Sequence, residues 1–319
     1  MNHRFIETNG ITMHIAEQGE GRLVVLCHGF PECWYSWRHQ LPALADAGYH
    51  AVAPDQRGFG QTDQPEPIEA YHILQSTSDI VGLVQALGEE QAVIAGHDWG
   101  AHVARHCALL RPDIFRAVIL LSVPFVLRSW TDPRPTEWMK QLSGDKEFYI
   151  LHYQEPGKAE AEMEADVRKT LWTTFVSESL SPEKRGSWLF NKSEKYVGPF
   201  IKPDVFPDWF TEQDLDYYTR EFERTGFRGG LNWYRNYDRN WELTPFLAGA
   251  KLRQPTLFVT GEYDGVLAIR RAAFNILEET VLNLWKKVVL AGAGHWIQQE
   301  RPAEVNQLLI EFLASLSEK

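Results

Sequence analysis

Residues 91–110 read Gln-Ala-Val-Ile-Ala-Gly-His-Asp-Trp-Gly-Ala-His-Val-Ala-Arg-His-Cys-Ala-Leu-Leu, and this stretch decides the fold. Its first part, Gln91–Ala95, is the short apolar run of a buried strand, and Ala101–Leu110 has the pattern of a helix. Two glycines stand between them, one on each side of a His-Asp-Trp triplet centred on Asp98. Small residues around a central residue permit a sharp turn, because larger side chains there would collide with the neighbouring turn. The stretch therefore predicts a strand, an elbow and a helix, with Asp98 at the elbow.

Short apolar runs and helical patterns alternate along much of the remaining chain. Strands are predicted at residues 22–27, 50–54, 115–121, 255–260 and 287–290, and helices at residues 77–87, 266–282 and 302–316. This alternation is typical of a mostly parallel sheet with helices on its faces. We therefore predict an α/β fold with a central, mostly parallel sheet flanked by helices.

The character of the sequence changes in the middle of the chain. Strand-like runs disappear, charged helical patterns occupy residues 158–177 and 211–224, and seven of the twelve tryptophans fall in this region. Aromatic enrichment suits either the packing of a small layer onto the core or the lining of a closed pocket. We predict a helical cap at residues 126–245, inserted between two parts of an α/β core, residues 1–125 and 246–319.

Three polar residues follow predicted strands in a characteristic chain order. Asp98, Asp264 and His295 each come shortly after a different strand. Because parallel strands end at one edge of the sheet, these side chains are predicted to converge there. A nucleophile on a strand–helix elbow, followed by an acid and then a histidine, is the order of a catalytic triad, although the usual nucleophile is serine. Two alternatives stay open, because aspartate often caps a helix after a strand and Glu262 competes with Asp264 as the acid.

Two further loops fit the same arrangement. His28–Pro31 (His-Gly-Phe-Pro) follows the strand at 22–27, in the place of the loop that donates a second backbone N–H to an oxyanion. We therefore expect the N–H groups of Phe30 and Trp99 to form an oxyanion hole, although an ordinary β-turn explains the same glycine and proline. The loop Asp55–Gly60 (Asp-Gln-Arg-Gly-Phe-Gly) is predicted to have a structural role.

These motifs together resemble a known family. The HGFP, DxRGxG and GHDWG elements, the late aspartate at 264 and the Gly-His-Trp of residues 294–296 look like the epoxide hydrolases of the α/β-hydrolase fold. The resemblance covers essentially the whole chain, including the helical middle segment. It implies an enzyme that opens an organic epoxide with water to give a vicinal diol.

Two segments of the predicted cap add to the resemblance. Residues 147–157 and 226–236 look like the two cap segments of the soluble epoxide hydrolases, each of which carries a tyrosine aimed at the epoxide oxygen. By motif position these tyrosines are Tyr149 and Tyr234. Tyr153 competes with Tyr149 for the first role.

The residue types suit the implied reaction. An aspartate with an ordinary pKa of ~3.9 is ionised at neutral pH, so Asp98 needs no base and can attack a saturated carbon to form an alkyl ester. Phenols on the cap can hydrogen-bond the epoxide oxygen and protonate it as the ring opens. His295, neutral and oriented by Asp264, is expected to activate the water that hydrolyses the ester. No metal or organic cofactor is required, and no HExxH pattern occurs.

Two other functions compete with this interpretation. A haloalkane dehalogenase shares the fold and the aspartate nucleophile, and there Trp99 would bind halide through its indole N–H. Such enzymes often carry asparagine directly after His-Gly, where this chain has Phe30. A non-catalytic relative that binds ligands as a receptor is the second alternative, although this chain has a candidate for every catalytic role.

Composition limits the partners. The chain has 319 residues, 44% hydrophobic and 24% charged, which is ordinary for a globular protein. Its net charge is 32 − 43 = −11 and no dense Lys/Arg run occurs, so nucleic acid and anionic membranes are poor partners. Three cysteines outside any CxxC spacing, a polar N-terminus and no apolar run of ~20 residues predict a soluble cytoplasmic protein without a membrane span. The expected partners are an apolar epoxide and water, and the choice between monomer and homodimer is open.

Overall fold

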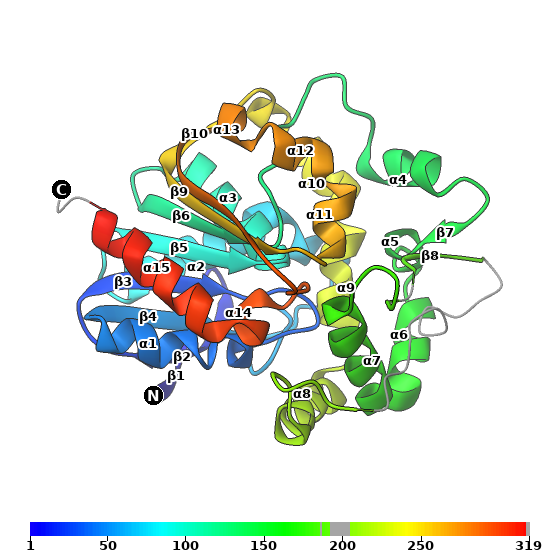
Figure 1. Cartoon of the computed structure of the whole chain (residues 1–319), viewed down its shortest axis with the longest axis horizontal. Coiled ribbons are helices and arrows are strands. Elements are labelled where there is room, and N and C mark those ends of the chain that lie inside the picture. Colours follow the sequence, from blue (N-terminus) through cyan, green and yellow to red (C-terminus); the bar gives the residue numbers. More distant parts are fainter. Residues whose placement is uncertain (186, 192–204, 317–319) are drawn as a thin grey trace.

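The protein is described here by a computed structural model, in which residues 1–185, 187–191 and 205–316 are placed. An eight-stranded sheet forms its centre, with the strand order β1-β2-β4-β3-β5-β6-β9-β10 (Figure 1). The strands are β1 (Asn2–Thr8), β2 (Ile11–Gln18), β3 (Arg22–Cys27), β4 (Tyr49–Pro54), β5 (Ala92–His97), β6 (Phe115–Leu121), β9 (Leu252–Gly261) and β10 (Val281–Leu290). The six strands from β4 to β10 in this order are parallel, and β2 joins β4 in the antiparallel sense. The predicted mostly parallel sheet is therefore confirmed.

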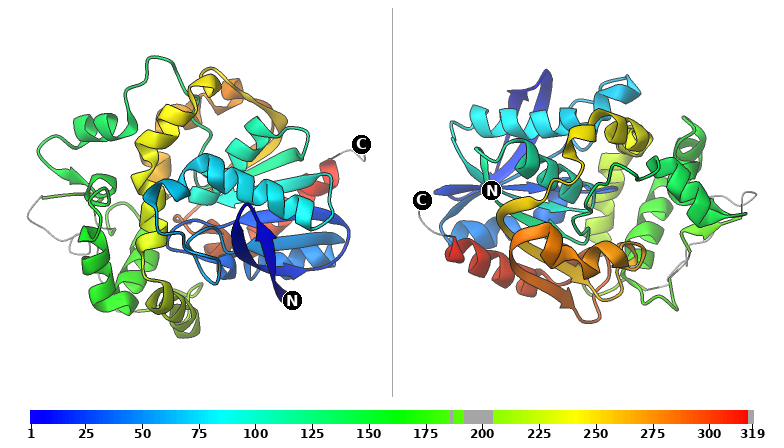
Figure 2. Two further views of the ribbon diagram at one scale, coloured as in Figure 1. Left: turned by 180° about the vertical axis from the view of Figure 1, so that it is seen from behind. Right: turned by 90° about the horizontal axis from the view of Figure 1, so that it is seen from above.

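Helices cover both faces of the sheet (Figure 2). On one face, α1 (Gln40–Asp46) and α15 (Pro302–Ser315) contribute leucines and a phenylalanine to a core shared with β3, β5 and β6. On the other face, α2 (Ile73–Ala86) and α3 (Trp99–Leu110) pack on the opposite side chains of the same strands. Alternate residues of buried parallel strands point to opposite faces, so each strand supplies both cores.

The regular structure described between β6 and β9 is mostly helical, and it lies beside the end of the sheet at which β5 gives way to α3 (Figure 1). It contains α4 (Pro135–Ser143), α5 (Tyr149–His152), α6 (Lys158–Met163), α7 (Val167–Ser179), α8 (Glu212–Thr225), α9 (Arg228–Arg235) and α10 (Tyr237–Leu243), with a short antiparallel pair, β7 (Glu147–Phe148) and β8 (Leu189–Phe190). We call residues 126–245 the cap segment. Its aromatic residues join the same hydrophobic core as α2 and α3, so the segment packs directly on the sheet layer.

One predicted element is wrong. The helix expected at residues 266–282 is broken into α11 (Gly265–Ile269), α12 (Arg271–Asn275) and α13 (Leu277–Thr280), and the chain then enters β10 at Val281. Val281 pairs with Leu252 of β9, so the last residues of the predicted helix belong to a strand, although their apolar spacing also fits a helix. Tertiary pairing here overrides the local pattern.

The opening hairpin of β1 and β2 was not predicted. Most of β1 is exposed, so it lacks the apolar run that marks a buried strand. The turn does leave a signal, because Asn9 and Gly10 have φ of 44° and 75° and an Asn-Gly pair favours a two-residue hairpin turn.

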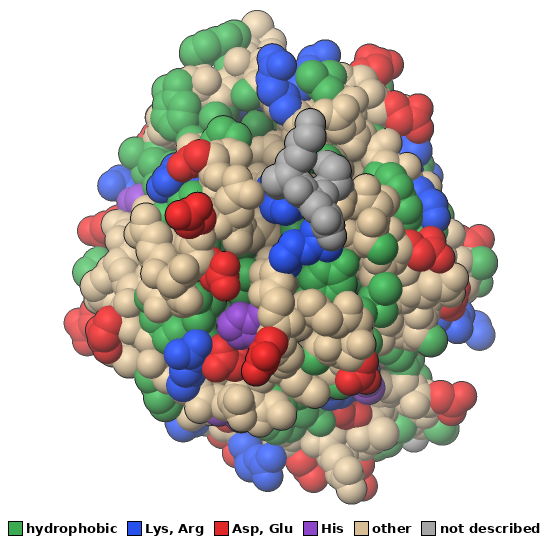
Figure 3. Space-filling view, turned by 90° about the vertical axis from the view of Figure 1, so that its left-hand side faces the viewer, with side chains coloured by type: hydrophobic (Ala, Val, Ile, Leu, Met, Phe, Trp, Pro, Cys, Tyr) green, Lys and Arg blue, Asp and Glu red, His purple; other side chains and the backbone are tan. Residues whose placement is uncertain are grey.

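The face opposite the cap segment carries acidic and basic side chains interspersed with apolar ones (Figure 3). No single-sign patch dominates this face, in keeping with charges spread along the chain. Among the residues that the structure describes, no helix combines the length and the apolar character needed to cross a membrane.

Candidate active site

Asp98 occupies a backbone conformation that only its surroundings can maintain. It is the residue between β5 and α3, with φ 51° and ψ −117°. A Cβ atom at Gly96 would collide with the backbone of Gly100, and one at Gly100 would collide with the backbone of Cys27. A Cβ at Gly29 would collide with the Asp98 side chain itself. Residues 29, 96 and 100 must therefore be glycine, because a side chain at any of them would collide with neighbouring backbone or with the Asp98 carboxylate.

Two backbone N–H groups bind the Asp98 carboxylate. The N–H of Phe30 donates to Asp98 Oδ1 at 3.0 Å, and the N–H of Trp99 makes a second backbone hydrogen bond to the same carboxylate. Burial raises the pKa of Asp98, while the neighbouring imidazoles of His295 and His97 and these two hydrogen bonds act in the opposite direction. The pair of N–H groups expected from the sequence thus lies against the predicted nucleophile.

His295 lies between the two aspartates predicted to accompany it. Its Nδ1 is 3.1 Å from Asp264 Oδ1, and its Nε2 is 3.7 Å from Asp98 Oδ2. Asp264 is itself fixed, because its Oδ1 accepts the N–H of Val266 at 2.8 Å. Glu262, the competing acid, is exposed and accepts the N–H of Gly292 at 2.9 Å, so Asp264 is the acid that contacts the imidazole.

The surroundings of His295 favour its protonated form. Burial would lower the pKa of His295, but the Asp264 carboxylate and its hydrogen bond, with the charges of Asp98 and Glu178, raise it to about 10. Glu178 reaches this site from α7, and its carbonyl oxygen accepts the N–H of His295 at 3.1 Å. The carboxylates around His295 therefore favour the charged imidazolium while Asp98 is a free carboxylate.

A buried polar network under the elbow holds the His295 backbone. The carbonyl oxygen of His295 lies 2.8 Å from His97 Nε2 and accepts the hydroxyl of Ser122 at 2.7 Å. His97 Nδ1 lies 2.8 Å from Glu32 Oε2, and both side chains are fully buried. Both ring nitrogens of His97 therefore face an oxygen that can accept a hydrogen bond. Sequence analysis missed Glu32, His97 and Ser122, although two of them stand within the HGFPE and GHDWG stretches.

The cap segment closes a small cavity over Asp98. Asp98, Trp99, Tyr149, Tyr234 and Trp188 are among its lining residues. Tyr153 does not line it, and its buried ring packs 5.4 Å from the ring of Tyr149 and 5.0 Å from that of Tyr234. The two tyrosines assigned by motif position therefore share a cavity with the predicted nucleophile, and the ring of Tyr153 packs against both of them.

Comparisons with known proteins decide the family. The family model of the alpha/beta hydrolase fold matches residues 22–152. Epoxide hydrolase A of Mycobacterium tuberculosis (strain ATCC 25618 / H37Rv) is 45% identical over 318 residues, which cover 98% of this chain and 97% of the relative. The chain belongs to the epoxide hydrolase family.

Solved structures of epoxide hydrolases have the same overall fold. The crystal structure of epoxide hydrolase A from Mycobacterium thermoresistibile has a TM-score of 0.94 and 50% identity, covering 100% of this chain and 99% of that one. An epoxide hydrolase from an endophytic Streptomyces has a TM-score of 0.95 and 46% identity, covering 98% of this chain and 95% of that one.

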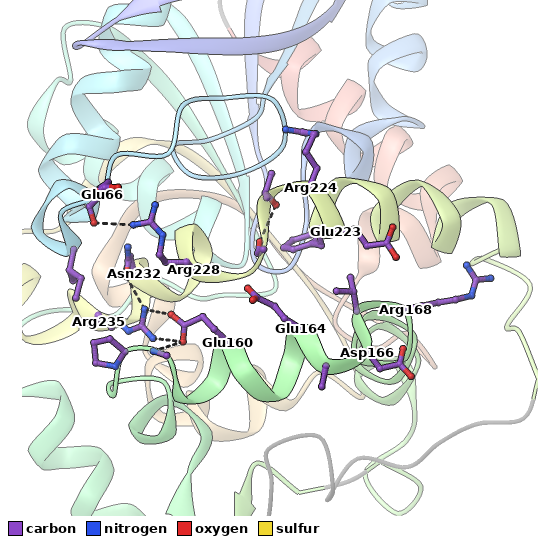
Figure 4. A pocket seen from close by; sticks show the side chains of 18 residues that line it. Glu66, Glu160, Glu164, Asp166, Arg168, Glu223, Arg224, Arg228, Asn232 and Arg235 are labelled. Atoms are coloured by element: carbon purple, nitrogen blue, oxygen red, sulfur yellow. Dashed lines mark hydrogen bonds and ion pairs between the residues drawn. The ribbon is translucent and has the colours of Figure 1, made fainter.

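A large cleft of this epoxide hydrolase lies away from Asp98, between α6, α8 and α9 (Figure 4). It has a volume of about 1040 Å³ and is lined by many charged side chains. Several of these charged side chains already form ion pairs or hydrogen bonds with other residues. Arg235 binds both carboxylate oxygens of Glu160, at 2.7 and 2.8 Å, and Arg228 donates to the carbonyl oxygen of Glu66 at 3.0 Å. The first of these interactions lies within the cap segment, and the second joins the cap segment to the core.

The candidate site also lacks the groups that would hold a metal. In the described part of this hydrolase, no cluster of three or more His, Cys, Asp or Glu side chains is placed to bind a metal ion.

Proposed function

We propose that the protein hydrolyses an organic epoxide to a vicinal diol through a covalent ester on Asp98. The observation that carries this proposal is the asymmetry of the carboxylate. Oδ1 accepts the N–H of Phe30, whereas Oδ2 lies 3.7 Å from His295 in a cavity also lined by Tyr149 and Tyr234. One oxygen is therefore held as the future carbonyl oxygen, and the other is the nucleophile.

In the first step, Asp98 Oδ2 attacks one ring carbon and the bond between that carbon and the epoxide oxygen breaks. Negative charge grows on the departing oxygen, which Tyr149 and Tyr234 are placed to stabilise by hydrogen bonds. One phenol gives its proton to this oxygen and becomes a phenolate. The products are an alkyl ester on Asp98 and a neighbouring hydroxyl group.

Ester formation changes the charge beside His295. The Asp98 carboxylate is one of the groups that raise the pKa of His295 to about 10, and the neutral ester no longer contributes. His295 then releases its proton more readily, and that proton restores the phenol through the cavity. The imidazole becomes a base at the moment when a base is needed.

In the second step, neutral His295 takes a proton from a water molecule that attacks the Asp98 carboxyl carbon. The N–H groups of Phe30 and Trp99 stabilise the tetrahedral oxyanion. The intermediate collapses, the bond between the carboxyl carbon and the ester oxygen breaks, and the hydroxyl proton of the intermediate passes to the departing alkoxide. The diol leaves, and Asp98 and His295 return to their charged forms.

We further propose that the cap segment, residues 126–245, acts as the lid of a core formed by residues 1–125 and 246–319. Its aromatic side chains exclude bulk water from the cavity and contribute the two phenols. An excluded environment strengthens each hydrogen bond to the developing charge.

A paired assay tests the proposed function. Styrene oxide and a 1-haloalkane are offered separately to the purified protein, and diol and free halide are measured, with Asp98→Ala as the blank. Diol formation that Asp98→Ala abolishes, without halide release, is the expected result. Halide release without diol would reassign the protein as a dehalogenase, and diol formation by Asp98→Ala would remove the covalent mechanism.

A further inference from the structure

A second cavity adjoins the active-site cavity and differs from it in charge. It has a volume of about 510 Å³ and shares six lining residues with the smaller cavity over Asp98, namely Trp99, His102, Trp138, Tyr237, Ile269 and Arg270. The two hollows are therefore neighbours separated only by these side chains. We call the second one the arginine pocket, because Arg105, Arg128 and Arg270 line it.

The three arginines of this pocket have no ion-pair partner among the residues that the structure describes. One guanidinium nitrogen of Arg105 and Nε of Arg128 are buried and have no hydrogen-bond partner there, while another nitrogen of Arg128 donates to the hydroxyl of Thr244 at 2.9 Å. Arg270 is placed against the ring of Trp138, at 4.8 Å. Buried cationic groups are normally paired, because removal from water without a partner is unfavourable.

The other titratable groups around the pocket supply one negative charge for three arginines. Asp132 is the acidic residue of the lining, and its charge acts on Arg128. Burial and the charge of Arg105 lower the pKa of His102 well below its usual value and that of His106 to about 3, so both imidazoles are neutral. Burial and the like charge of Arg270 lower the pKa of Arg105 to about 10, which leaves it cationic at neutral pH.

The remaining wall of the pocket is mostly apolar, with Asn240 and Thr244 as its uncharged polar residues. Phe125, Leu127, Trp241 and Leu247 contribute to it. An apolar wall with unpaired guanidinium groups suits a molecule that has a hydrocarbon body and one anionic group. Asp98 directly precedes α3, and Arg105 lies seven residues further along this helix. At ~1.5 Å per residue, seven residues correspond to about 10 Å along the helix axis. One molecule can therefore reach both sites.

We propose that the arginine pocket is an anion-binding subsite that takes a carboxylate at the far end of the substrate, so that the preferred substrates are epoxides bearing an acid group. This inference rests on the proposed function, because it assigns the second end of a substrate whose epoxide lies at Asp98. The subsite orients the substrate by holding one end while the cap tyrosines and Asp98 act on the other.

The test compares each acid with its own methyl ester. The terminal epoxides of heptanoic, nonanoic and undecanoic acid are assayed beside their methyl esters, and styrene oxide serves as a substrate without a carboxylate. We expect kcat/KM for at least one acid to exceed that for its ester by about tenfold or more, mainly through KM. Arg105→Gln and Arg270→Gln should each bring that ratio towards one.

Arg111→Gln is the matched control. Arg111 directly follows α3, but its side chain is exposed and paired with Asp113 at 2.6 Å, so the ratio of acid to ester should stay as in the unsubstituted protein. As a second readout, nonanoate should inhibit diol formation from styrene oxide more strongly than nonanamide does.

The failure of this inference is distinct from the failure of the proposed function. If styrene oxide is hydrolysed, yet no acid is preferred over its ester and nonanoate inhibits no better than nonanamide, the arginine pocket is not a carboxylate subsite. If the acid is preferred but Arg105→Gln and Arg270→Gln keep the full preference, the carboxylate binds elsewhere. If no epoxide is hydrolysed, the proposed function itself is wrong.

Discussion

The two walls of the active-site cavity are built in different ways. On the core wall, Asp98, His295 and Asp264 are held by hydrogen bonds to backbone groups and to each other. On the cap wall, the ring of Tyr149 packs against the rings of its aromatic neighbours, 5.6 Å from that of Trp188. Hydrogen bonds fix atoms within tenths of an ångström, whereas ring packing admits many arrangements of similar energy.

This difference between the two walls indicates which groups must be positioned precisely in the proposed cycle. Bond formation at a carboxylate oxygen requires a fixed nucleophile and base, and these come from the core wall. The cap wall must fit substrates of different shape and needs only to bring phenols near the departing oxygen. Substitutions on the core wall should therefore have larger effects than substitutions on the cap wall, and the following experiments test this ranking.

The largest effect is expected at the base. In His295→Gln, turnover should fall by about 1,000-fold or more, because the ester forms but no group activates water. Intact mass spectrometry after mixing with styrene oxide should show one equivalent of alkylated protein. A variant that turns over slowly without accumulating the adduct would contradict the assigned role of His295.

The second effect concerns the network beneath the elbow. Glu32 accepts hydrogen bonds from Gly29 and Gln298, at 2.8 and 2.9 Å, besides its buried pair with His97. Glu32→Gln should lower the free energy of unfolding by about 3 kcal/mol, because it removes a fully buried carboxylate that faces His97 and accepts hydrogen bonds from Gly29 and Gln298. Urea unfolding measures this change. Glu262→Gln, at an exposed carboxylate, should change it by less than about 0.5 kcal/mol, and equal effects would argue against a stabilising pair.

Smaller effects are expected on the cap wall. Tyr149→Phe and Tyr234→Phe should each slow ester formation by roughly tenfold, because the second phenol still stabilises the departing oxygen. Rapid-mixing fluorescence of the tryptophans follows this step. Tyr153→Phe is the matched control and should slow it by less than about threefold. If Tyr153→Phe had the strongest effect of the three, the first cap acid would be assigned to the wrong tyrosine.

The smallest expected effect is a change in the pKa of His295. A pKa of about 10 keeps His295 protonated at neutral pH, and the Asp98 charge contributes to that value. Asp98→Asn removes this charge as ester formation does, so the pKa of His295 should fall and the ring should lose its proton at lower pH. Nitrogen chemical shifts of labelled histidine report the titration. Identical curves for the two proteins would show that the charge of Asp98 does not control the base.

The contrast between the walls also explains what could be read from the sequence. Asp98, Asp264 and His295 each follow a strand of the parallel sheet, next to glycines that mark a turn. Because parallel strands end at one edge of the sheet, this chain order predicted that the three side chains converge. The predicted strands at 22–27 and 115–121 coincide with β3 and β6 because both are buried on two faces.

Other features depend on partners that are distant in sequence. Motif position favoured Tyr149 over Tyr153 without excluding the latter, because only the packed cap segment decides which ring lines the cavity. The pKa of His295 is raised by Asp264 and Asp98 and also by Glu178, which lies 117 positions earlier in the chain. The unpaired state of Arg105 likewise follows from the absence of an acidic neighbour among the described residues, and a list of residues cannot reveal it.

The unequal surroundings of the two Asp98 oxygens have an isotopic consequence. Oδ1 stays bound to the N–H of Phe30, and Oδ2 faces His295. In the proposed cycle Oδ2 leaves with the diol and an oxygen from water takes its place, whereas Oδ1 is never released. The first diol made in heavy-oxygen water therefore carries an old oxygen from the protein. After many turnovers Asp98 itself should have gained one heavy oxygen, and the other should still date from the synthesis of the chain.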